Sequence, residues 1–310
     1  MERKIVFNDE IEINSFGGVA CRLTLTSPDC SPVTLVLDRQ QNTLLQNRFV
    51  RQYLVLISES RLIDMIDKAP NYSELERVAR KYSLCDVCDF SDINIYGAKR
   101  ALKVIVNTLY RYPKLRGKFC YIGSPEGYLR QMERLAAGDM QILRDFGLQY
   151  ICEKSISHKL GEMMRHVARS VLEGDRTYIA MAVSAFGLFD AILLDSEDYE
   201  GYAYIKLVSD LKQDMLAGFH PEGCYTPESV IYHEIGHLID YLCGLSENPR
   251  LLSFVRPLTQ RDVERGLSRY ATTSTAELVA EAFAEYICNP TPRPIAAKIG
   301  QLIESEYSKL

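Results

Sequence analysis

The sequence predicts an α+β protein, with a small β-rich module over residues 1–60 and a larger domain of helices and strands over residues 61–310. Apolar and polar side chains alternate between residues 19 and 26, which is the period of a half-buried strand. Beyond residue 59, apolar residues recur with the helical period, and short apolar segments separate the helices. The 310 residues suffice for one large domain or two modest ones.

The expected elements follow in chain order. In the N-terminal module, strands are expected over residues 19–26 and 32–38, because turn-forming glycines and prolines flank them. A capping box formed by Ser73 and Glu76 predicts the start of one helix, and a proline ends another that covers residues 98–112. Further helices are expected over residues 126–137, 158–172 and 202–217, and short strands over residues 118–122 and 188–194.

The most informative segment of the chain is His233-Glu234-Ile235-Gly236-His237. On a helix, two histidines four residues apart lie on the same face, so both imidazoles can bind one zinc ion. The glutamate between them can then take a proton from an attacking water. The segment therefore predicts a zinc site with hydrolytic chemistry.

The flanks of this segment support a helix. Thr226 is a suitable N-cap, Pro227 suits the first helical position, and Gly244 suits the left-handed residue that ends a helix. His233, His237 and Asp240 share one face of this helix. The alternative is an ordinary amphipathic helix with two incidental histidines. The opposite, apolar face carries Ile231, Ile235, Leu238, Ile239 and Leu242.

The third metal ligand separates the families of such enzymes. Asp240 and Cys243 stand where a motif with a third histidine would need glycine and histidine, so that type is excluded. A later helix carries Glu277, Glu281 and Glu285 four residues apart, on one face. This spacing does not choose a ligand among the three, and a solvated acidic face is the alternative interpretation.

Two segments resemble the catalytic core of the lethal-factor-like zinc metallopeptidases, a gluzincin family that includes the Pro-Pro endopeptidases. They are HEIGHLID (His233–Asp240) and YATTSTAELVAEAF (Tyr270–Phe283), which match every fixed position of H-E-x-G-H-x-x-D and Y-x(6)-E-x-x-A-E-A-F. The resemblance implies a zincin-like domain with a mixed sheet and an active-site helix. It also implies that one zinc ion is bound by His233, His237 and Glu277.

The resemblance further assigns roles around the metal. It implies that Glu234 is the general base, that the hydroxyl of Tyr270 stabilises the oxyanion, and that Glu281 supports a ligand histidine. Independently of the family, a carboxylate such as Glu281 or Asp240 can fix the tautomer of a ligand histidine through its second ring nitrogen. The catalytic residues are therefore expected to be Glu234 and Tyr270.

The expected function is that of a zinc metalloendopeptidase acting on an extended protein or peptide substrate. Such substrates pair with an edge strand beside the active-site helix, and Phe189–Leu194 is the candidate edge, with a buried central strand as the alternative. A competing hypothesis is a catalytically silent binding or structural module, such as a virion or mobile-element component. The presence of Glu234 and Tyr270 favours the enzyme.

Composition narrows the partners and the location. The net charge of −5 and the absence of a basic run argue against nucleic acid as a partner. The first residues lack the apolar stretch of a signal peptide. Asp190 interrupts the most apolar segment of the chain, so no membrane-spanning segment is visible. A cytoplasmic protein without membrane contact is therefore expected. Cys85 and Cys88 form a lone C-x-x-C pair without a second ligand pair nearby, and structural thiols are expected.

Overall fold

The computed structural model describes residues 14–16, 20–27, 30–38, 57–146, 154–173, 179–183, 190–199 and 201–310. Near the N-terminus, three strands form an antiparallel sheet in the order β1-β2-β3. Two of them confirm the predicted strands, and the third, β1, was not expected. The strands are β1 (Asn14–Phe16), β2 (Ala20–Ser27) and β3 (Cys30–Asp38).

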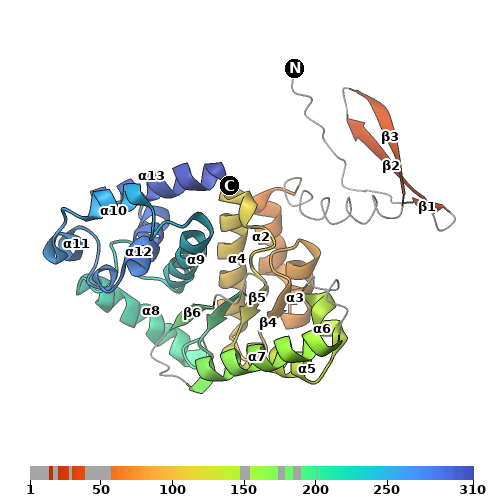
Figure 1. Cartoon of the computed structure of the whole chain (residues 1–310), viewed down its shortest axis with the longest axis horizontal. Coiled ribbons are helices and arrows are strands. Elements are labelled where there is room, and N and C mark those ends of the chain that lie inside the picture. The colour runs from red at the N-terminus through yellow and green to blue at the C-terminus, as the bar shows by residue number, and fades with distance from the viewer. Residues whose placement is uncertain are drawn as a thin grey trace.

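A second sheet lies in the larger part of the chain and has the order β4-β5-β7-β6. It is mixed, because β4, β5 and β7 run parallel while β6 is antiparallel to β7. Figure 1 shows this sheet at the centre of the larger body. Its strands are β4 (Val87–Asp89), β5 (Tyr121–Gly123), β6 (Ala180–Val183) and β7 (Ala191–Leu194).

The prediction that Phe189–Leu194 forms the edge strand is wrong. Within this segment, Ala191–Leu194 forms β7, which lies between β5 and β6 and has all four residues buried, so the alternative of a buried central strand is confirmed. Phe189 lies outside the described residues. An unbroken apolar run of this kind suits a strand covered on both faces. Among the described strands, β6 ends the sheet on this side.

Helices cover both faces of the second sheet. The alternating side chains Val87 and Cys88 enter two different cores: Cys88 joins the core of α2, α3 and α4, and Val87 joins the core of α5, α6 and α7.

The predicted capping box at Ser73 is wrong, because Asn71 caps α3 by accepting from the Glu74 N–H. The six helices are α2 (Glu59–Lys68), α3 (Tyr72–Lys81), α4 (Ile95–Arg111), α5 (Pro125–Ala136), α6 (Met140–Asp145) and α7 (Lys154–Glu173).

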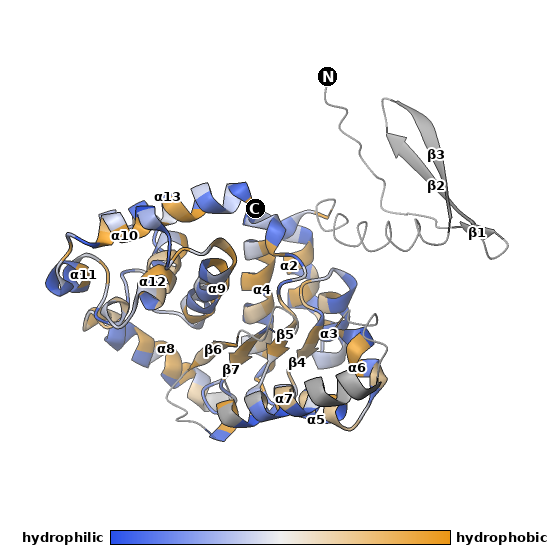
Figure 2. Cartoon of the chain, viewed as in Figure 1, coloured by the Kyte–Doolittle hydropathy of each residue, from blue (hydrophilic) through white to orange (hydrophobic). Residues whose placement is uncertain are grey.

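The C-terminal third is helical, and α9 and α12 pack side by side next to the sheet (Figure 1). Hydrophobic residues dominate the strands of the second sheet, whereas the outer helices α10 and α13 are mixed (Figure 2). None of the helices within the described ranges is long and apolar enough to cross a membrane. The elements are η1 (Pro113–Leu115), α8 (Gly201–Leu216), α9 (Pro227–Cys243), α10 (Pro249–Val255), α11 (Gln260–Gly266), η2 (Tyr270–Thr272), α12 (Thr275–Cys288) and α13 (Pro294–Lys309).

Candidate metal centre

Helix α9 begins and ends where the sequence predicts. Thr226 is the N-cap, but its backbone rather than its hydroxyl is engaged: Ser229 Oγ donates to the Thr226 carbonyl at 2.6 Å. Gly244 ends the helix with φ 59°, as expected, a conformation that costs glycine little. The predicted apolar face is buried at Ile231 and Ile235. Core packing on this face holds the histidines in place on the other.

Helix α12 supplies the third ligand candidate from the opposite side. Ser274 caps it by accepting a hydrogen bond from the Glu277 N–H at 3.1 Å. The solvated-face interpretation of its glutamates is wrong, because Glu281 and Glu285 are only 1 % and 0 % exposed. A buried carboxylate needs partners, and each of the three glutamates has its own set of partners, although Glu277 and Glu281 both contact His233.

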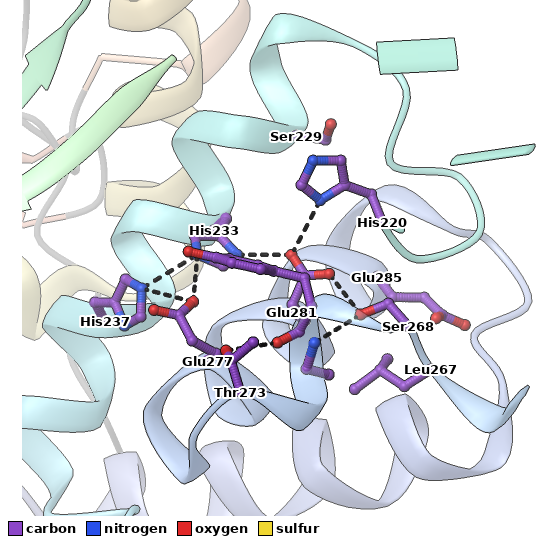
Figure 3. Close-up of polar contacts among 12 residues, drawn as sticks. His220, Ser229, His233, His237, Leu267, Ser268, Thr273, Glu277, Glu281 and Glu285 are labelled. Carbon is purple, nitrogen blue, oxygen red and sulfur yellow. Dashed lines mark hydrogen bonds and ion pairs between the residues drawn. The ribbon is translucent and has the colours of Figure 1, made fainter. Parts of the chain in front are cut away.

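Glu277 faces both histidines of α9 (Figure 3). Its Oε2 lies 3.0 Å from His233 Nε2 and 3.3 Å from His237 Nε2, and the two imidazole nitrogens are 3.1 Å apart. One ligand atom from each residue lies within 4.8 Å of the others. Two helices, from segments more than thirty residues apart, therefore bring together the three ligands that the resemblance implies.

The chemistry of these three atoms fits a cation. His233 Nδ1 faces Glu281 Oε1 at 2.8 Å, so a neutral His233 carries its proton there and its lone pair on Nε2. No hydrogen bond of good geometry reaches Glu277 Oε2, although this oxygen is buried. Converging lone pairs repel one another unless a proton or a metal ion lies between them. Two imidazoles and one carboxylate, with a further position open, are a zinc donor set.

The close contacts among His233, His237 and Glu277 also shift the pKa values of His233 and Glu277. Burial opposes the charged form of His233, but the carboxylates of Glu277 and Glu281 beside its two ring nitrogens outweigh it and raise the pKa of His233 to about 10. Burial acts to raise the pKa of Glu277, yet the adjacent His233 and His237 lower it to about 2. The carboxylate is thus ionised and ready to bind a cation.

Glu281 supports His233 and is itself held by two residues that the sequence analysis missed. Ser268 Oγ donates to Glu281 Oε2 at 2.7 Å, and His220 Nδ1 lies 3.5 Å from Glu281 Oε1 (Figure 3). Burial acts to raise the pKa of Glu281, but the two histidines lower it to about 2. No motif points to His220 or Ser268, because both come from loops that only the tertiary structure brings to α12.

Glu285 does not belong to the metal centre. Its carboxylate accepts hydrogen bonds from three donors of Arg293: the backbone N–H at 2.7 Å, Nε at 3.0 Å and Nη2 at 2.6 Å. Arg293 also donates to the backbone carbonyl of Leu267. This buried ion pair connects α12 to the start of α13 and to the loop before η2.

Asp240 also has a different partner from the one expected. It was a candidate for orienting a ligand histidine, but its carboxylate accepts from the backbone N–H of Ser246 at 2.6 Å and from the Ser246 hydroxyl. Asp240 lies at the C-terminal end of α9, where the following loop presents these donors. It therefore stabilises the loop after α9.

Glu234 is buried beside the metal-binding group and contacts the edge strand. Its Oε2 accepts from the Ala182 N–H at 2.6 Å, and burial raises the pKa of its carboxyl. The Ile179 carbonyl accepts from the Asp195 N–H at 2.9 Å, so alternate residues of β6 face β7. The backbone groups of Ala180 and Ala182 consequently face the open side of β6.

Tyr270 lies in η2, next to the metal-binding group. Its ring centroid is 5.7 Å from that of His233, and it lines the same cavity as Glu234. Burial, followed by the charges of Glu277 and Glu234, raises the pKa of Tyr270 to about 12. Its hydroxyl is therefore protonated at neutral pH and can donate a hydrogen bond to a developing oxyanion.

The cysteine pair lies away from this centre. Cys85 and Cys88 are buried and free, and Cys88 lies within β4. Over the described part of the chain, the group of His233, His237 and Glu277 is the one set of three side chains arranged to hold a metal.

Comparisons of the chain with protein-family models, with curated proteins and with solved structures found no match.

Proposed function

We propose that this chain is a zinc-dependent endopeptidase that hydrolyses an extended peptide. The observation that carries the proposal is the convergence of His233, His237 and Glu277 beside the buried carboxylate of Glu234. Structural zinc sites have four protein ligands, whereas catalytic sites keep a position open for water or substrate. Three ligands with an adjacent base match the catalytic type.

The residues divide the chemistry between them. Zinc, when bound, supplies a Lewis acid that polarises a carbonyl and lowers the pKa of water to about 7. Glu234 accepts the proton of the attacking water and delivers it to the leaving amine. Its raised pKa suits a group that takes up a proton and then releases it. The hydroxyl of Tyr270 donates to the oxygen of the scissile carbonyl as charge develops there.

The edge strand suits an extended substrate. Ala180 directs its N–H and carbonyl, and Ala182 its carbonyl, to the open side of β6, where a peptide can add as a further strand, while the Ala182 N–H donates to Glu234. The hydrogen bond between Ala182 and Glu234 puts this edge within contact distance of the base. A peptide paired with β6 would carry a backbone carbonyl past the metal-binding group.

The decisive experiment is a peptide-library digest, read by mass spectrometry, with wild type and Glu234→Gln. The amide keeps the size of the side chain but does not take up the water's proton, so this variant should bind zinc and cleave nothing. Cleavage by the wild type should also stop when a chelator removes the metal, and return when zinc is added.

A negative digest has a defined meaning. Zinc-loaded wild type that cleaves no peptide in a diverse library and in a proline-rich library would contradict the peptidase. The alternative of a catalytically silent binding module would then take its place. Cleavage that persists in Glu234→Gln would point to a contaminating protease.

A further inference from the structure

A cavity of about 380 Å³ lies directly beside the metal-binding group. His233 and Glu234 of α9 form part of its wall, together with Tyr270. Helix α8 contributes Leu211 and Asp214. The cavity is large enough for a side chain of a bound peptide, and the metal chemistry itself does not need this space.

Much of the cavity wall is apolar. Leu211 and Ala284 are each 1 % exposed, and Val230 contributes from α9, one turn before His233. The ring of Phe219 is partly exposed and also lines the cavity. These surfaces favour the hydrocarbon part of a side chain, whose burial releases water.

Away from His233 and Tyr270, three polar side chains of the cavity can accept hydrogen bonds or carry negative charge. Ser229 Oγ donates to the Thr226 carbonyl and accepts from the Thr226 N–H at 3.3 Å, so it has no hydrogen left to donate to a ligand and one lone pair left to accept. His220 turns Nδ1 toward Glu281, and its second ring nitrogen, which carries the lone pair in the neutral form, points toward Ser229 (Figure 3). Asp214 adds a carboxylate.

No lysine or arginine lines this cavity in the described part of the chain. The guanidinium of Arg269 stacks on Phe219, 5.7 Å from the ring centroid, but is not part of the lining. Within the described residues, no lysine, arginine or histidine forms an ion pair with Asp214 within 4.0 Å. A cationic group that reaches Asp214 would thus meet a carboxylate without a lysine or arginine in the described lining to compete for it.

The position of β6 determines which side chain of a substrate enters. Ile179 and Ala180 line the cavity at the N-terminal end of β6, whereas Ala182, further along, contacts Glu234. A peptide that pairs antiparallel to β6, the slightly more stable arrangement, runs from Ala182 toward Ile179. Its residue just after the scissile bond therefore lies over the cavity.

We propose that this cavity selects a lysine or arginine as the first residue after the scissile bond, with Asp214 as the specificity-determining residue. The hydrocarbon stem would lie against Leu211, Val230 and Phe219, and the charged end would pair with Asp214. The substrate class is thus a peptide cleaved before a basic residue. The assignment to a position relative to the scissile bond rests on the proposed peptidase function.

The test compares wild type with Asp214→Asn and Asp214→Lys, with Asp210→Asn as the matched control. Asp210 lies one turn earlier on α8, is exposed, and does not line the cavity. In library digests, basic residues should be enriched directly after the cut. Asp214→Asn should reduce kcat/KM for such peptides about fivefold to tenfold, and Asp214→Lys should favour acidic residues. Asp210→Asn should match the wild type.

A binding measurement keeps the proposal testable if no cleavage is found. Zinc-loaded Glu234→Gln should enrich lysine- and arginine-containing peptides from the same library. The double variant that carries both Glu234→Gln and Asp214→Asn should show no such enrichment. If cleavage is absent but this enrichment occurs, the peptidase fails and the basic specificity of the cavity stands. Equal capture or cleavage of apolar and basic peptides, unchanged by Asp214→Asn, would overturn the proposal.

Discussion

Gly236 of α9 faces Ala280 of α12 so closely that a β-carbon on the glycine would lie 2.7 Å from Ala280 Cα and 3.2 Å from its carbonyl oxygen. The two helices therefore approach each other backbone to backbone at the level of the metal ligands. This spacing allows Glu277 to reach the two histidines. It also gives a physical reason for glycine between Glu234 and His237.

We expect Gly236→Ala to lower the free energy of unfolding by about 1–3 kcal/mol, because the added methyl group forces α9 and α12 apart. Zinc affinity should fall as well, since the two helices share the ligands. Urea unfolding of the metal-free protein and competition with a chelator measure the two effects. Gly244→Ala is the control: its β-carbon would meet no atom within 4 Å, but its φ of 59° should cost about 1–2 kcal/mol without changing zinc affinity. Wild-type zinc affinity in Gly236→Ala would show that helix spacing does not govern the site.

We expect one zinc ion per chain by elemental analysis, and none in Glu277→Ala. Glu281→Ala should keep the three ligands but weaken zinc binding about 10–100-fold, because His233 loses the carboxylate that orients it. A chelator titration separates the two variants. The ligand assignment would be wrong if Glu281→Ala lost the metal while Glu277→Ala retained it.

Tyr270→Phe should keep the zinc content and reduce kcat by about 10²–10³-fold, the usual effect of removing an oxyanion donor. The reduction should be constant across the neutral pH range, because the raised pKa of about 12 keeps the hydroxyl protonated throughout. Tyr225→Phe, an exposed tyrosine that does not line the cavity, serves as the control. An unchanged kcat in Tyr270→Phe would remove this residue from the mechanism.

Glu285→Ala should destabilise the protein by about 3–5 kcal/mol, because it leaves the Arg293 guanidinium without its buried partner. Zinc stoichiometry of the folded protein should not change. The control uses the same arginine: Glu222 lies 3.7 Å from Arg293 but is 65 % exposed, and Glu222→Ala should cost at most about 1 kcal/mol. Chemical denaturation measures both, and loss of zinc from folded Glu285→Ala would assign this glutamate to the metal centre.

Replacement of both Cys85 and Cys88 by alanine should leave the zinc content unchanged. Both thiols are buried, and hydrogen bonding to Cys88 together with burial raises the pKa of Cys85, so it is not a ready thiolate ligand. Elemental analysis and thiol titration of the unfolded protein test this expectation. A second zinc ion that disappears in the double variant would contradict it.

The sequence alone predicts the elements that depend on local interactions. The bounds of α9 follow from Pro227, Gly244 and the apolar stripe, all of which act within a few residues. The mixed α/β character follows in the same way from periodicity, because apolar segments of helical period alternate with short apolar segments along the chain. The predicted start of α3 is wrong by two residues, because Asn71 and Ser73 are both suitable N-caps and the helix begins after Asn71.

Tertiary structure alone decides which residue meets which partner. Glu277, Glu281 and Glu285 are equivalent by spacing, and they differ only because α12 faces His233 and His237 at its start, His220 and Ser268 in its middle, and Arg293 at its end. The edge strand is β6 rather than β7 because strand order depends on long-range pairing. Such contacts join segments far apart in the chain, and helical or strand periodicity carries no information about them.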